Sequence, residues 1–331
     1  LTSIANGIIV FDKTGLVSIV DPLYSDAIRE YYVSADQHVH ELFLSGGVWQ
    51  DGDLTSITNT SSITSAGSSL ASLFDPNYHG VRTDYISNDQ HVHEMFLAGG
   101  VWQDADLTTI AGGTEVSAGS GLVSILDPVH STVRVYYIGS DQHVHELFLT
   151  GGLWQAADLT ALTGTGKAAA NSMFANLYDP LYDALRTYYI GADQHVHELF
   201  FSGDVWHDGD LTDITGAANA IAGSGLATLY DPKYKAIRTD YIGVDQKVHE
   251  LFLSEGFWRD SDLPGIAVAS GSGLASIIDF INKAVRLYYI GADQDAHELF
   301  LYDGLWHDAD ITAITDGPNA ADRGPGTNGS N

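Results

Sequence analysis

The amino-acid sequence predicts an all-β protein, a six-bladed β-propeller with four antiparallel strands in each blade. One repeat of about fifty residues occurs six times, and each copy holds four short segments with the composition of strands. The tryptophans mark the repeat, because they occupy the same position in every copy, 48 to 53 residues apart. They are Trp49, Trp102, Trp154, Trp206, Trp258 and Trp306.

The four strands are clearest in the first copy. Residues of alternating character, rich in tyrosine and β-branched side chains, favour strands over helices. Asp21-Pro22 and Gly46-Gly47 are typical of the turns that join strands. We therefore expect strands at residues 15–20, 27–33 and 38–44, and a fourth around Val48 and Trp49.

The regular repeat predicts one domain rather than two. We expect a single propeller over residues 1–315, with repeats at about 15–58, 68–111, 119–163, 171–215, 223–266 and 271–315. Leu1-Thr2-Ser3-Ile4 resembles the end of a repeat, either the seam of the ring or the remnant of an upstream copy. The polar, glycine-rich residues 316–331 predict a flexible C-terminal tail.

Charge and composition exclude several classes of partner. The chain carries 43 acidic residues against 14 lysines and arginines, a net charge of -29, which repels nucleic acid and anionic membranes. Its apolar runs are too short for a membrane span, so we expect a soluble protein with no membrane insertion. The absence of cysteine excludes disulfides and thiolate metal sites. The compartment, secreted or cytoplasmic, stays open.

An arginine and a glutamate occur in every copy, always twelve residues apart, on the second and third predicted strands. The arginines are Arg29, Arg82, Arg134, Arg186, Arg238 and Arg286. The glutamates are Glu41, Glu94, Glu146, Glu198, Glu250 and Glu298. One interpretation is a structural salt bridge. The other is a sugar clamp, in which arginine donates to hydroxyls, glutamate accepts from them and the tryptophan stacks on the ring.

Histidines precede the glutamate in every copy, as at His40, and a second histidine often lies two positions earlier, as at His38. Two histidines at this spacing share one face of a strand, as a metal site requires. However, Lys247 and Asp295 replace the earlier histidine in the last two copies, and no third ligand is apparent at a regular spacing. We therefore expect structural histidines and no metal or cofactor. The Asp-x-Asp pairs, such as Asp51 and Asp53, are expected to cap turns rather than bind calcium.

No catalytic centre is apparent, because the polar residues repeat evenly instead of concentrating in one blade. The sequence contains no nucleophile elbow, phosphate-binding loop or zinc-protease helix. It predicts a non-catalytic, multivalent lectin whose partners are glycans or glycoconjugates. The alternatives are a protein-interaction propeller with structural Arg–Glu pairs, and a polysaccharide lyase or hydrolase with one specialised blade.

The spacing of Arg29, Tyr31, Tyr32, Glu41 and Trp49 resembles that of the Aleuria-type fungal fucose-specific lectins. The resemblance extends over all six copies. It implies a six-bladed propeller with sugar pockets between adjacent blades, fucose or a related neutral monosaccharide as ligand, and the repeated arginine, glutamate and tryptophan as carbohydrate-binding residues.

The chain departs from this family at the end of the first strand, where an aspartate stands in place of the family's tryptophan. The aspartates are Asp21, Asp75, Asp127, Asp179, Asp231 and Asp279. A nearby tyrosine, found at Tyr24, Tyr78, Tyr182 and Tyr234, is a candidate for the missing aromatic wall, and His130 and Asn282 replace it in the other two copies. The fifth and sixth copies diverge most, so we expect weaker or altered binding there.

Overall fold

The structure is a computed structural model that describes residues 15–24, 27–61, 64, 68–315 and 317. These residues form six sheets of four antiparallel strands, and each sheet is made by one copy of the repeat. The chain divides into two compact units, Leu1–Ser172 and Met173–Asn331, with three sheets each. The N-terminal seam, and the tail from residue 316 except residue 317, lie outside the described residues.

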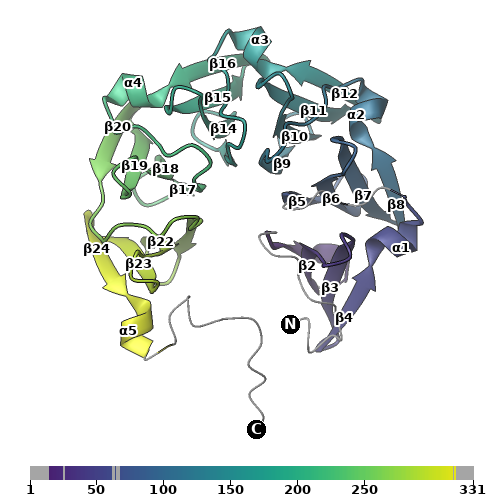
Figure 1. Cartoon of the computed structure of the whole chain (residues 1–331), viewed down its shortest axis with the longest axis horizontal. Helices are drawn as coiled ribbons and strands as arrows, with labels where there is room; N and C mark the ends of the chain where they lie inside the picture. The colour runs from purple at the N-terminus through teal and green to yellow at the C-terminus, as the bar shows by residue number, and fades with distance from the viewer. Residues whose placement is uncertain (1–14, 25–26, 62–63, 65–67, 316, 318–331) are drawn as a thin grey trace. The chain divides into compact units, whose positions relative to one another are not determined.

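The first unit begins at the purple end of the chain in Figure 1. Its first sheet consists of β1 (Val17–Asp21), β2 (Ala27–Val33), β3 (Val39–Ser45) and β4 (Val48–Asp53). The second consists of β5 (Leu70–Asp75), β6 (Gly80–Ile86), β7 (Val92–Ala98) and β8 (Val101–Asp106). The third consists of β9 (Leu122–Asp127), β10 (Thr132–Ile138), β11 (Val144–Thr150) and β12 (Leu153–Asp158). The helices are α1 (Leu54–Thr58), α2 (Leu107–Ala111), α3 (Leu159–Thr163) and a 3₁₀ turn (Pro22–Tyr24).

The second unit repeats this plan. Its fourth sheet consists of β13 (Phe174–Asp179), β14 (Ala184–Ile190), β15 (Val196–Ser202) and β16 (Val205–Asp210), followed by α4 (Leu211–Thr215). The fifth consists of β17 (Leu226–Asp231), β18 (Ala236–Ile242), β19 (Val248–Ser254) and β20 (Phe257–Asp262). The sixth consists of β21 (Ala275–Asp279), β22 (Ala284–Ile290), β23 (Ala296–Tyr302) and β24 (Leu305–Asp310), followed by α5 (Ile311–Thr315).

The prediction of four strands per copy is confirmed, with one difference at the fourth strand. β4 continues to Asp53, where its prediction centred on Val48 and Trp49, and leads directly into α1. Asp53 has an extended backbone, and its side chain accepts the N–H of Ser56, so it is the N-cap of the helix. The short helices were not predicted, because five residues carry too little periodicity to reveal one.

Apolar side chains pack between neighbouring sheets within each unit. Residues two apart on a strand share a face, so Tyr31 and Val33 of the first sheet point the same way. They pack against Val81 and Met95 of the second sheet. The same pairing of faces forms the cores between the second and third, fourth and fifth, and fifth and sixth sheets.

The turn between the second and third strands places a glutamine in the left-handed region. Gln37 has φ 68°, its N–H donates to Ser34 O, and the N–H of Ser34 donates to His38 O. Gln90, Gln142, Gln194, Gln246 and Gln294 repeat this conformation. The carbonyl oxygen of Gln37 accepts the N–H of Thr64, so a backbone hydrogen bond joins the connection that leads to the next sheet to this turn.

Among the described residues no helix is both long enough and apolar enough to cross a membrane.

Candidate functional site

The arginine of every sheet lies between two carboxylates of its own sheet. In the second sheet, Nε of Arg82 donates to Oδ2 of Asp75 at 2.8 Å and Nη1 donates to Oε1 of Glu94 at 2.6 Å. In the other five sheets the corresponding distances are 2.8–3.2 Å and 2.5–2.7 Å. The ion pair that the twelve-residue spacing suggested is therefore present in all six sheets.

The strand register explains how the pair meets. Arg29 lies opposite Phe43, and Tyr31 lies opposite Glu41, so arginine and glutamate are diagonal neighbours on one face of adjacent strands. The ring centroid of Phe43 lies 5.5 Å from Cζ of Arg29, which is within the range of a cation–π contact with the guanidinium.

The aspartate at the end of the first strand performs two tasks, of which only the turn was predicted, at Asp21-Pro22. Oδ1 of Asp75 accepts the N–H groups of Asn77 at 2.9 Å and Tyr78 at 3.3 Å, which closes the turn. Its Oδ2 accepts from Arg82. The presence of this aspartate in all six copies was the signal that could have revealed the role. It gives each arginine a second anion and fixes the orientation of the guanidinium.

Burial makes this arrangement rigid. In the fourth sheet Arg186 is 5% exposed and Glu198 is 2% exposed. Burial raises the pKa of the Glu198 carboxyl, although Arg186 opposes the shift. Burial alone would lower the pKa of the Arg186 guanidinium, but Glu198, Tyr188 and Asp179 together outweigh burial, and this pKa lies above its ordinary value. The guanidinium is therefore held charged in a fixed position.

Within each unit, the tryptophan that approaches an arginine–glutamate pair comes from the next sheet along the chain. Trp258 of the fifth sheet meets Tyr188 of the fourth edge-on, with ring centroids 6.1 Å apart. Trp306 of the sixth sheet donates from Nε1 to Oε2 of Glu250 in the fifth at 3.4 Å. In the first unit, Trp102 packs edge-on against Tyr31, and Cζ of Arg82 lies 5.9 Å from the Trp154 ring. Arginine and glutamate of one repeat thus meet tryptophan of the next.

A tyrosine from the turn after the first strand lies on the other side of the arginine. Cζ of Arg29 lies 5.2 Å from the Tyr24 ring centroid, and the Tyr24 hydroxyl reaches the glycine turn of the second sheet at Gly100. Tyr78, Tyr182 and Tyr234 repeat both contacts, with Cζ-to-centroid distances of 5.4–5.8 Å. These tyrosines stand where the sequence analysis sought an aromatic wall.

Between the fourth and fifth sheets these side chains line one cavity of about 250 Å³. Its lining includes Tyr182, Arg186, Glu198, Phe200 and Trp258. An aromatic wall from each sheet therefore flanks an arginine and a glutamate, which offer fixed donors and acceptors. This combination suits a small, neutral, polyhydroxylated molecule with one apolar face.

The residue beside the glutamate differs between sheets. Tyr31 and Tyr188 donate their hydroxyls to Oε1 of Glu41 and Glu198 at 3.0 and 3.1 Å. In the second and fifth sheets the same position holds an aspartate, Asp84 or Asp240, that is fully buried. Burial, followed by repulsion from the nearby glutamate, raises the pKa of both aspartates well above its ordinary value. This replacement of tyrosine by aspartate was not predicted as a feature of the site.

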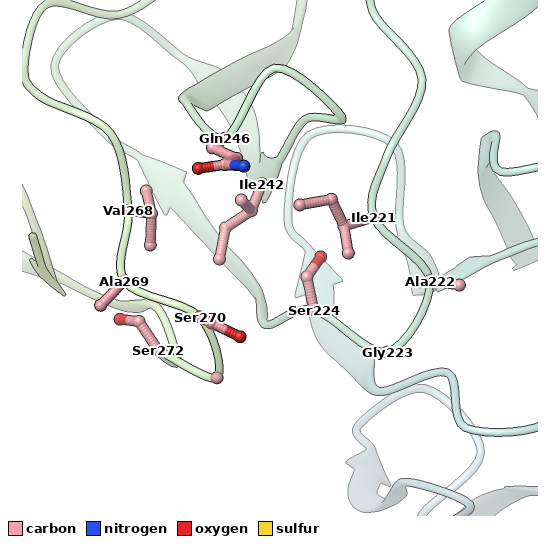
Figure 2. Close-up of a pocket in the computed structure, with 11 residues that line it drawn as sticks. Ile221, Ala222, Gly223, Ser224, Ile242, Gln246, Val268, Ala269, Ser270 and Ser272 are labelled. Atoms are coloured by element: carbon pink, nitrogen blue, oxygen red, sulfur yellow. The ribbon is translucent and has the colours of Figure 1, made fainter. Parts of the chain in front are cut away.

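A second cavity, of about 320 Å³, lies between the connections that precede the fifth and sixth sheets. Figure 2 shows Ile221 and Ser224 on one side of it and Val268 and Ser270 on the other, with Gln246 above. None of the repeated arginines, glutamates or tryptophans lines it. It offers amide and hydroxyl groups without a charged side chain.

The match to a known family agrees with the geometry. A family model described as fungal fucose-specific lectin matches residues 21–230. The chain belongs to this lectin family. No curated protein matches the chain.

Solved lectin structures share the fold of this fungal fucose-specific lectin family member. BP39L lectin from Burkholderia pseudomallei is 14% identical with a TM-score of 0.74, over 91% of this chain and 85% of that one. The lectin of Aleuria aurantia, described as a six-bladed β-propeller, is 18% identical with a TM-score of 0.55, over 86% and 90% of the two chains. SapL1 lectin in complex with α-methyl fucoside is 20% identical with a TM-score of 0.56, over 89% and 95%. The predicted six-bladed β-propeller fold is confirmed.

Four complete sets of arginine, glutamate and tryptophan lie within the two units of this lectin. They are Arg29–Glu41–Trp102, Arg82–Glu94–Trp154, Arg186–Glu198–Trp258 and Arg238–Glu250–Trp306. Trp49 and Trp206 belong to the first sheet of each unit, and the pairs Arg134–Glu146 and Arg286–Glu298 belong to the last. Within these four sets the three kinds of predicted residue lie together, and the tryptophan comes from the following repeat.

The repeated histidines of the lectin are bound to carboxylates of their own sheet. Nε2 of His145 lies 3.1 Å from Oδ1 of Asp141, and the His145 ring stacks on Tyr137 with centroids 5.5 Å apart. The aspartates that end the fourth strands cap the short helices, where turn caps were expected. Asp51, the first of its Asp-x-Asp pair, instead accepts the hydroxyl of Tyr32 at 2.9 Å.

Proposed function

We propose that this chain is a non-catalytic, multivalent lectin that binds fucose or a related neutral monosaccharide in the cavities between neighbouring sheets. The observation that carries the proposal is the cavity in which Arg186 and Glu198 lie between Tyr182 and Trp258. Membership of the fungal fucose-specific lectin family and the likeness to a lectin complexed with α-methyl fucoside support it. The comparisons favour neither the interaction scaffold nor the polysaccharide-cleaving enzyme.

The chemistry of the cavity matches a deoxy sugar. The guanidinium of Arg186 donates to sugar hydroxyls, and Glu198 accepts from them through the oxygen that its arginine leaves available. The faces of Trp258 and Tyr182 pack on C–H groups, and a 6-deoxy sugar adds a methyl group to this apolar surface. Because Asp179 also holds Arg186, the clamp is ordered before the ligand arrives.

The same geometry argues for binding without catalysis. Glycosidases use two carboxyl groups, one as an acid and one as a base or nucleophile, on opposite sides of the scissile bond. Here the glutamate is already paired with an arginine, and the aspartate on the arginine's far side caps a turn. These contacts serve positioning, and they recur in every sheet.

Multivalency follows from the repeat. A monosaccharide in an open site is expected to bind with a Kd of roughly micromolar to millimolar, since few atoms are buried. Several such sites that engage one glycan-coated surface raise the avidity without any new contact. The fifth and sixth copies are expected to bind more weakly or with altered preference.

The test is calorimetric titration with methyl α-L-fucoside, with methyl α-D-mannoside as the control sugar. We expect selective heat from the fucoside with several sites per chain. A folded protein that gives no heat with the fucoside, and no signal on a glycan array, would refute the lectin proposal.

A further inference from the structure

The first sheet gathers two histidines and two aspartates at the end opposite the Asp21 turn. The cluster consists of Asp36, His38, His40 and Asp53, each of which offers one ligand atom within 4.8 Å of the others. Nδ1 of His38 lies 2.9 Å from Oδ2 of Asp53 and 3.8 Å from Oδ2 of Asp36. Nε2 of His40 lies 3.9 Å from Oδ1 of Asp36.

The strands bring these four side chains together. His40 lies opposite Asp53 in the register of β3 and β4, and His38 shares the face of His40 because it lies two residues earlier. Asp36 enters from the tight turn that Gln37 closes with its left-handed backbone. The sequence analysis considered the two histidines alone and found no third ligand. The turn supplies a third ligand, Asp36, and the register supplies a fourth, Asp53, which was expected to cap a turn.

The two ring nitrogens of His40 have the different surroundings that a metal-binding histidine needs. Its side chain is buried, only 2% exposed, and Nδ1 faces Oδ2 of Asp51 at 3.4 Å. Its Nε2 has no hydrogen-bond partner among the described residues and faces the cluster. Oδ1 of Asp36 is meanwhile engaged by the Ser34 hydroxyl and the His38 N–H. A carboxylate on one ring nitrogen and an unpartnered nitrogen on the other is the arrangement in which a histidine typically binds a metal ion.

We propose that Asp36, His38, His40 and Asp53 bind a divalent transition-metal ion, with Zn²⁺ as the best match. A tetrahedral ion with ligands at about 2.0–2.1 Å holds them about 3.4 Å apart. Three of the separations, 2.9–3.9 Å, bracket that value, and all four ligand atoms lie within 4.8 Å of one another. Two imidazoles favour zinc over calcium or magnesium, which take oxygen ligands. The two carboxylates match the charge of the ion.

The second sheet repeats the complete set with Asp89, His91, His93 and Asp106. Nδ1 of His91 lies 2.9 Å from Asp106, Nε2 of His93 lies 3.3 Å from Asp89, and Asp104 lies 3.6 Å behind His93. In each of the third, fourth and sixth sheets, the corresponding group contains one histidine and two aspartates. The fifth sheet has Lys247 in place of the first histidine and forms no such group in the part of the chain that the structure describes.

The cluster has a structural consequence when an ion is bound. Asp36 and His38 belong to the turn between the second and third strands, and Asp53 begins α1 at the end of the fourth. An ion therefore joins the turn to the corner that leads into the next repeat. We expect Zn²⁺ to stabilise the first and second sheets by mass action.

The test is calorimetric titration of chelator-treated full-length protein with Zn²⁺ and, separately, with Ca²⁺. We expect two tight Zn²⁺ sites per chain, a higher melting temperature with Zn²⁺, and no comparable binding of Ca²⁺. The variant His38→Gln/His91→Gln removes one ligand from each complete set, a side chain that is only 24–27% exposed, and we expect at least a tenfold loss of Zn²⁺ affinity. Lys247→Gln is the matched control at the same position of the fifth sheet, and its Zn²⁺ binding should equal that of the wild type.

Circular dichroism establishes that each protein is folded before titration. Asp53→Asn/Asp106→Asn provides a second variant, because asparagine keeps the helix N-cap while it removes a charged ligand. Wild-type protein that binds Zn²⁺ no more tightly than Ca²⁺, or no more tightly than both folded double variants, would overturn the proposal.

Discussion

The indole nitrogen of Trp306 in the sixth sheet donates to Oε2 of Glu250 in the fifth at 3.4 Å. The other carboxylate oxygen, Oε1, accepts from Arg238 at 2.6 Å. One glutamate is thus shared between an arginine of its own sheet and a tryptophan of the next. The long contact to the tryptophan is the weaker of the two, and it is the one that a ligand hydroxyl would replace.

The tryptophan of the following repeat is expected to form each sugar site. Trp258→Ala removes one wall of the cavity that Arg186 and Glu198 line, so the number of fucoside sites per chain should fall by about one. Trp258→Phe keeps an aromatic face and should retain measurable binding there. Calorimetric stoichiometry distinguishes the two variants. An unchanged number of sites in Trp258→Ala would place the sugar elsewhere.

The arginine and the glutamate are expected to differ in their effects on stability. Arg186→Ala leaves Asp179 and Glu198 buried without their cation and should cost about 3–5 kcal/mol. Glu198→Gln still accepts from Arg186, so it should cost less while weakening fucoside binding by about tenfold, or ~1.4 kcal/mol. Urea unfolding and titration measure the two effects. Equal destabilisation by both variants, with binding unaffected in Glu198→Gln, would favour a purely structural pair.

The next prediction separates the contribution of the Tyr182 ring to sugar binding from that of its hydroxyl. Tyr182 contributes its ring to the cavity, with the centroid 5.8 Å from Cζ of Arg186. Tyr182→Phe preserves the ring and should bind the fucoside nearly as the wild type does, whereas Tyr182→Ala should bind less at that site. The comparison is made by titration at equal protein concentration. If Tyr182→Phe loses as much binding as Tyr182→Ala, the hydroxyl rather than the aromatic face is what matters.

The buried Asp240 predicts a pH effect on stability. Burial and the neighbouring Glu250 raise the pKa of Asp240 in the folded state, opposed by Arg238. A carboxyl whose folded pKa exceeds its unfolded pKa takes up a proton on folding, so its contribution to stability falls as pH rises through that interval. Asp240→Asn removes this penalty and should stabilise the protein by about 1–3 kcal/mol at neutral pH and by less near pH 4.

The control for this prediction is Asp303→Asn, since the Asp303 side chain is 77% exposed. Urea unfolding midpoints of the three proteins across pH 4–8 provide the measurement. A difference between wild type and Asp240→Asn that does not change with pH would show that Asp240 is ionised throughout this range.

Much of the fold was predictable because the six copies show which residue types each position of the repeat accepts. The segment around Tyr31 and Val33 is rich in tyrosine and β-branched residues in the copies, and the glycine pair at Gly46 and Gly47 fixes the next hairpin. The end of β4 and the helix α1 were missed, because Asp53 looks like a turn residue until its N-cap role is seen.

The candidate site was predicted in composition but not in assembly. Arginine and glutamate twelve residues apart predicted a contact within a sheet, which local register determines. The partnership of Arg29 with Asp21 and of Glu250 with Trp306 depends on a turn and on packing between sheets. The aspartate precedes the arginine by seven residues in five copies and by eight in the first, a signal that was present in the sequence but was not used, whereas no spacing within one repeat encodes the contact with the tryptophan of the next repeat.

A crystal structure of the protein with methyl α-L-fucoside would show where the sugar binds. We expect a sugar between Tyr182 and Trp258 whose hydroxyls bond to Arg186 and Glu198, with equivalent density at the other complete sets of arginine, glutamate and tryptophan. Sugar bound only outside these sets, or no sugar at a concentration that saturates binding in solution, would contradict this expectation.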